Sequence, residues 1–96
     1  MHVISKKPLR EFWEKHTDSE EPLQTWYRAM EKEAYENWAQ LRNAFPAVDT
    51  VDKKVVFNIG GNKYRLITVI HFDRKLVFVR HVLTHKEYDE GKWKNG

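Results

Sequence analysis

One short polar segment near the C-terminus holds the residue types that could do chemistry. Residues 84–93 read THKEYDEGKW and place a histidine and a tyrosine among acids and lysines. An imidazole can take or give a proton near neutral pH, which makes His85 a candidate general acid or base. Thr84 and Glu87 have the spacing of a capping box, which would fix His85 in the first turn of a helix. A plain surface histidine in a capped turn is the alternative interpretation.

Two arginines in the preceding β-rich segments could supply positive charge beside that histidine. Strands are predicted from the runs 53–59, 63–72 and 75–83, with two-residue turns at 60–61 and 73–74. Side-chain alternation then places Arg65 and Arg80 on one open face, in two strands that pair. Neither strand carries an acid on that face, so we expect the arginines to bind a phosphate. Neutralising acids from elsewhere are the alternative, and a one-residue bulge would break the parity.

A histidine beside two arginines suits cleavage of RNA through its own 2′-hydroxyl. The reaction needs a base at the 2′ oxygen, an acid at the 5′ oxygen and cations on the phosphorane, and each well-placed acid or base contributes roughly 10²–10⁴-fold. It needs no metal. His81 and His85 do not form a metal-ligand pair, because a strand runs through residues 81–83. By the same alternation His81 falls on the apolar face, as a histidine at the core margin. We therefore expect no metal and no cofactor.

The elements that must position these residues are visible in the spacing of apolar side chains. Three helical stripes recur at intervals of three and four in the first half, and they comprise Leu9, Phe12, Trp13 and His16; Leu23, Trp26, Tyr27 and Met30; and Trp38, Leu41 and Phe45. Ser5 and either Asp18 or Ser19 are predicted caps of the first two helices. The fold class is therefore α+β, with N-terminal helices on one face of a three- to four-stranded antiparallel sheet. Residues 2–4 are the candidate fourth strand, at an edge.

Composition restricts the class of protein further. The 96 residues suit one domain, 1–96, and 41% of them are hydrophobic, which is enough for a modest core. There is no cysteine, and the formal net charge of +3 comes from a basic second half. A basic half favours an acidic partner such as nucleic acid, although it is also ordinary surface charge. We expect a cytoplasmic protein with no membrane segment.

Three segments carry a resemblance to a known family. MHVI at 1–4, VVFNIGGNKYRLI at 55–67 and RHVLTHKEYDEGKW at 80–93 resemble the HigB toxins of bacterial type II toxin–antitoxin systems. The resemblance implies a RelE-like fold and an mRNA interferase, an endoribonuclease that cleaves mRNA on the ribosome and so inhibits translation and growth. It also implies a cognate HigA-type helix-turn-helix antitoxin as partner.

The resemblance also implies which residues do the work. His85 would be the general acid or base, and Arg65 and Arg80 would hold the scissile phosphate. Tyr88 would orient His85 or stack on a base, or else only pack under the C-terminal turn. Flanking RNA would contact a further set comprising Asn62, Lys63, Lys86, Lys92 and Lys94. The rival function is a non-catalytic module that docks RNA or protein on the same basic face.

Overall fold

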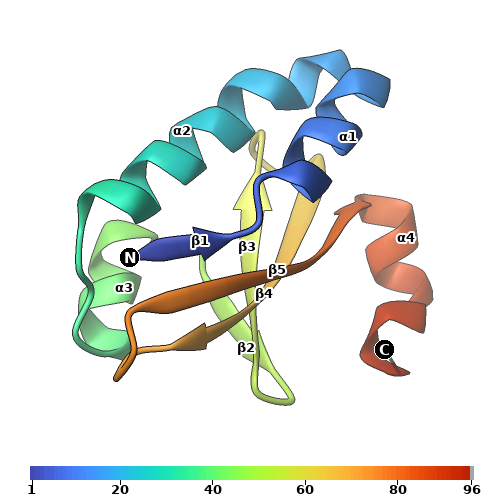
Figure 1. Cartoon of the computed structure of the whole chain (residues 1–96). Coiled ribbons are helices and arrows are strands. Elements are labelled where there is room, and N and C mark those ends of the chain that lie inside the picture. The colour runs from blue at the N-terminus through green and yellow to red at the C-terminus, as the bar shows by residue number, and fades with distance from the viewer. Residues whose placement is uncertain (96) are drawn as a thin grey trace.

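The chain forms one layer of helices against a five-stranded sheet (Figure 1). The computed structural model describes residues 1–95. The sheet order is β1-β5-β4-β3-β2, with β1 at His2–Ile4, β2 at Asp49–Val51, β3 at Lys54–Ile59, β4 at Tyr64–His71 and β5 at Leu76–Thr84. β1 runs parallel to β5, and the other pairs are antiparallel. The α+β class is confirmed, but the prediction of a purely antiparallel sheet of three to four strands is wrong.

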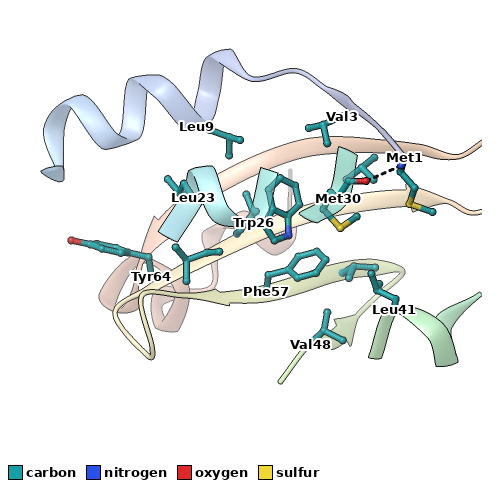
Figure 2. Close-up of a cluster of buried hydrophobic side chains, with 14 of the residues drawn as sticks. Met1, Val3, Leu9, Leu23, Trp26, Met30, Leu41, Val48, Phe57 and Tyr64 are labelled. Atoms are coloured by element: carbon teal, nitrogen blue, oxygen red, sulfur yellow. Dashed lines mark hydrogen bonds between the residues drawn. The ribbon is translucent and has the colours of Figure 1, made fainter. Parts of the chain in front are cut away.

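Three helices cover one face of this sheet. α1 spans Lys7–Lys15, α2 spans Glu20–Lys32 and α3 spans Trp38–Ala44, and a short 3₁₀ turn, η1, at Thr17–Ser19 joins the first two. Figure 2 shows their buried side chains meeting the sheet, with Trp26 packed edge-on against Phe57 at 5.4 Å between ring centroids. Leu9, Leu23 and Leu66 are fully buried in the same cluster. The apolar stripes read from the sequence therefore form the core, as predicted.

The helix caps differ from the prediction. Lys6, not Ser5, precedes α1, and no side chain caps that helix. Ser19 precedes α2, but its hydroxyl donates to the His16 carbonyl at 2.6 Å instead of capping. Asp18 accepts hydrogen bonds from Lys63 and from the Tyr64 hydroxyl, so it ties the start of the helical layer to the β3–β4 hairpin.

One turn is longer than predicted, and one strand contains a bulge. Ile59 pairs with Tyr64, so four residues separate these partners where the prediction placed two after Ile59. His71 pairs with Leu76 and the Lys75 N–H donates to the Phe72 carbonyl, so the predicted turn at 73–74 and its register are confirmed. An even loop length preserves the predicted parity through the first half of β5. The register then shifts, because Thr68 pairs with Val79 while Ile67 pairs with His81. Arg80 is the extra residue of a β-bulge, which turns the side chains beyond it to the opposite faces.

The C-terminal segment packs on the face of the sheet that the three helices leave uncovered. α4 spans His85–Glu90, and a 3₁₀ turn, η2, follows at Lys92–Asn95. Trp93 lies on Val56 and Ile67, with Leu83 and Tyr88 at the margin of this second cluster. We call this side of the sheet the C-terminal face. Within the described residues, no helix is long and apolar enough to span a membrane.

Candidate functional site

The end of β5 presents His85 as the capping box predicted. The Thr84 hydroxyl accepts from the Glu87 backbone N–H at 3.2 Å, and the Glu87 carboxylate accepts from the Thr84 backbone N–H at 2.9 Å. His85 is therefore the first residue of α4, and its own N–H donates to the Lys63 carbonyl. Its Nδ1 lies 2.9 Å from the Asp89 carboxylate, one helical turn along α4, and both side chains are at least half exposed.

Arg65 does not lie on an open face. Only 9% of it is exposed, and its guanidinium donates to the carbonyl oxygens of Asn62 and Tyr64 at 3.2 Å. The Asn62 side chain accepts a further, longer bond. The Tyr88 ring covers the guanidinium, with 5.4 Å between the ring centroid and the guanidinium carbon. The prediction of an uncovered Arg65 is wrong, because the C-terminal segment folds back over it.

Tyr88 and Trp93 form the cover of this arginine. Their rings stack at 5.1 Å between centroids with an interplanar angle of 13°, and the Trp93 indole N–H donates to the Tyr88 carbonyl at 2.9 Å. Of the two interpretations left open for Tyr88, this geometry supports packing. The predicted arrangement of two guanidiniums and one imidazole around a single RNA linkage is not present.

Arg80 is exposed, but the bulge separates it from Arg65. It lines a groove of about 250 Å³ between α1 and β5, together with Glu11, Lys15 and His81. Across the sheet, Arg65 pairs with Leu83 rather than standing beside Arg80. The predicted pairing of the two arginines on one face is therefore wrong, for the reason that a bulge reverses strand parity.

His81 lies on a different face from the one that side-chain alternation predicted. It pairs with Ile67, whose side chain lies under Trp93, so His81 is on the C-terminal face and not on the helical one. It lines a second groove, of about 310 Å³, between the sheet and the C-terminal segment. Its Nε2 is buried without a hydrogen-bond partner in the described structure. Burial lowers the pKa of His81, and the positive charges of Arg80 and Lys54 lower it further.

The predicted RNA-contacting residues do not gather at one groove. Lys92 lines this second groove, and Lys86 is exposed on α4. The Lys94 ammonium lies over the Trp93 ring at 5.8 Å. Lys63 is engaged in an ion pair with Asp18 at 2.9 Å. Asn62, as described, is a hydrogen-bond acceptor for Arg65. Their predicted contacts with RNA stay predictions.

A larger groove lies on the other side of the molecule and has a different character. It measures about 600 Å³ between α2 and β3, and apolar residues such as Trp26 and Ile59 line most of it. Its charged residues, Asp18 and Glu21, are acidic and would repel a phosphate. In the groove against α1, by contrast, the cations Arg80 and Lys15 outnumber the one acid, Glu11, so the region at His81 is the better candidate for an RNA site.

Comparisons with known proteins define the class. Residues 19–91 match the family model of the HigB toxin, described as the RelE-like toxic component of a toxin–antitoxin system. The "mRNA interferase toxin HigB" of Escherichia coli strain K12 is 34% identical over 92 residues, which cover 93% of this chain and 88% of the relative. The "mRNA interferase HigB" of E. coli O6:H1 is 36% identical over 93 residues, which cover 94% and 90%.

A match of this extent includes both structural layers and the segment that carries the predicted site. The chain is a RelE-like toxin, the toxic component of a toxin–antitoxin system. Within that class it belongs to the HigB toxin family.

Proposed function

We propose that this toxin is an mRNA interferase, an endoribonuclease that cleaves mRNA and thereby stops translation and growth. The observation that carries the proposal is the similarity, over nearly the whole chain, to relatives named mRNA interferases. The structure adds a fitting surface, because His81, Arg80 and Lys15 line the groove against α1. Lys92 lines the neighbouring groove, which His81 also lines. Such cations attract an RNA backbone and stabilise charge on the phosphorane.

The chemical step of the proposal is attack by the RNA 2′-hydroxyl without a metal ion. His85 serves in it as general acid or base, held by the capping box and by Asp89. Arg80 contacts the scissile phosphate from its exposed position. Arg65 is buried under Tyr88, and its role is to keep the C-terminal segment in place. The products are a 2′,3′-cyclic phosphate and a 5′-hydroxyl.

The partners of the proposal are mRNA on the ribosome in the cytoplasm and a cognate HigA-type helix-turn-helix antitoxin. Being the toxic component of a toxin–antitoxin system requires an antitoxin, and the helix-turn-helix type is the finer part of the proposal. The rival function, a non-catalytic binding module on the same face, needs the cations but not His85.

Expression in a bacterium with and without the antitoxin gene tests the proposal. Wild-type toxin alone should arrest growth and generate new 5′ ends within transcripts, and co-expressed antitoxin should suppress both. His85→Gln should fold and bind antitoxin yet lose growth arrest and cleavage. Intact transcripts during arrest by the wild type would favour the binding module. Full toxicity of His85→Gln would remove His85 from the mechanism. If the toxin also cleaves free RNA without ribosomes, that cleavage should continue when EDTA is added.

A further inference from the structure

We propose that His81 is a second catalytic residue, the general base that takes the proton from the attacking 2′-hydroxyl in the groove beneath the C-terminal segment. The proposal rests on the proposed function and deepens it, since it leaves the general-acid role to His85. No motif marks His81. It is identified by the bulge, by the grooves and by its unpartnered nitrogen.

The bulge at Arg80 is what brings His81 to the reacting surface. In a regular strand, His81 would share a face with Val79, which packs in the helical core. The extra residue places His81 opposite Ile67 instead, beside the cluster containing Trp93. Bulges re-aim side chains in this way, and they are over-represented next to active sites.

His81 lies where two grooves meet. It lines both the groove against α1 that contains Arg80 and the groove against the C-terminal segment that contains Lys92. An RNA strand that crosses β5 from one groove to the other would pass the imidazole. Arg80 then meets the phosphate on one side, and the apolar floor of Leu83 and Trp93 receives a base on the other.

The Nε2 atom of His81 has no partner within the described structure, although it is buried. A buried polar atom without a hydrogen bond costs free energy, commonly about 1–3 kcal/mol, and such an exception needs an explanation. The cost is smaller for a neutral ring, which keeps its one proton on this enclosed nitrogen. Nδ1 is then the unprotonated nitrogen, and it accepts the proton of the RNA hydroxyl.

The environment of His81 favours the neutral ring. Burial and the nearby cations lower the pKa of His81, so the ring is unprotonated at neutral pH and able to act as a base. Glu87, one of the acids near it, is engaged in the capping box with Thr84. The charged groups that face His81 from the packed elements are Arg80 on β5, Lys54 on β3, Glu11 and Lys15 on α1, Glu87 and Glu90 on α4, and Lys92 on η2.

The step balances without any further reactant. The 2′-hydroxyl gives its proton to His81 as the 2′ oxygen bonds to phosphorus. The bond between phosphorus and the 5′ oxygen breaks, and the 5′ oxygen takes a proton from the general acid. Asp89 beside His85 stabilises the protonated imidazole that this second role needs. His81 then returns its proton to solvent.

The test compares three glutamine variants on ribosomes programmed with one reporter mRNA, at saturating toxin and across roughly pH 5–8.5. His81→Gln should lower the cleavage rate constant by about 10²-fold or more, with half-saturation little changed, and should abolish the acid limb of the pH profile. His85→Gln should also lower the rate constant, because it removes the general acid. His71→Gln is the matched control, because His71 is exposed at the far end of the same face, where its ring packs on Phe78.

A direct binding measurement on wild-type toxin tests the same proposal without depending on whether the variant folds. In wild-type toxin, the ring-nitrogen NMR signal of His81 should shift when a non-cleavable RNA oligonucleotide is added, one that keeps the 2′-hydroxyl but carries a methylene group in place of the 5′ bridging oxygen. A His81→Gln variant that keeps the wild-type rate and acid limb would overturn the proposal, as would an unshifted His81 signal with bound RNA. Wild-type toxin that cleaves nothing would instead overturn the proposed function.

Discussion

The cover over Arg65 depends on one side chain, and its removal has a calculable effect. Trp93 is 4% exposed and rests on Val56 and Ile67. Truncation of a buried aromatic to alanine commonly costs about 3–5 kcal/mol. Trp93→Ala also removes the indole bond to the Tyr88 carbonyl, about 1 kcal/mol within that total. A loss of about 3 kcal/mol corresponds to a fall in Tm of about 12 °C or more for a domain of this size.

The loss can also be local, and the assay should separate the two outcomes. α4 and η2 pack in the second, smaller cluster and not in the main core, so they can detach while the sheet and the three helices stay folded. In that case urea unfolding shifts by less than about 3 kcal/mol, but amide exchange in residues 85–94 rises sharply and the Arg65 side chain becomes exposed. Trp93→Phe, which keeps most of the apolar area, should cost only about 1–2 kcal/mol and retain activity.

A matched truncation elsewhere makes the result interpretable. Trp38→Ala removes the same group from α3, where Trp38 packs against the main core on the opposite side of the sheet. It should lower stability without raising amide exchange in residues 85–94. If Trp93→Ala changes neither the unfolding free energy by more than about 0.5 kcal/mol nor the exchange, then the C-terminal segment does not depend on Trp93 and the described cover of Arg65 is incorrect.

Three further outcomes follow from the site geometry. Arg65→Ala should destabilise the fold by about 1–3 kcal/mol in urea unfolding, because it leaves buried acceptors unpaired. Arg80→Ala should change stability by less than about 0.5 kcal/mol while slowing cleavage, because Arg80 is exposed. Equal losses of stability in the two variants would contradict the difference in burial. Thr84→Ala should cost about 1 kcal/mol and reduce helicity of α4 by circular dichroism, and unchanged helicity would count against the capping box. The lowered pKa of His81 means that the unfolded chain binds the proton more tightly, so stability should fall as the pH drops below about 6.5, and His81→Gln should flatten that dependence.

Local sequence patterns predicted the elements that depend on local physics. The apolar stripe of Leu23, Trp26 and Met30 forms the buried side of α2, because a period near 3.6 gives one helix only one way to face a core. The capping box of Thr84 and Glu87 is present because its bonds join residues three apart in the chain. The hairpin glycines, Gly60 and Gly61, both adopt positive φ, which suits a tight turn.

Features set by contacts distant in sequence were not predictable in the same way. β1 pairs parallel with β5 across more than seventy residues, and its entry depends on the N-terminal ammonium donating to the Met30 carbonyl at 2.7 Å. β2 is only three residues long and carries no alternation to read. Side-chain alternation along β4 predicts an exposed Arg65, because its burial comes from Tyr88 and Trp93 in a separate segment that folds back over it.

The bulge at Arg80 connects these local and distant effects to function. With regular pairing, Arg65 and Arg80 would lie on one face and His81 would point into the helical core. A buried imidazole would stabilise that core less than an aliphatic side chain. The inserted residue directs Arg80 toward α1 and His81 toward the C-terminal groove, while Leu83 joins the apolar cluster under Trp93. One extra residue therefore exchanges an arginine pair for a histidine that lines two grooves. That exchange favours proton transfer, and not charge alone, as the chemistry of this face.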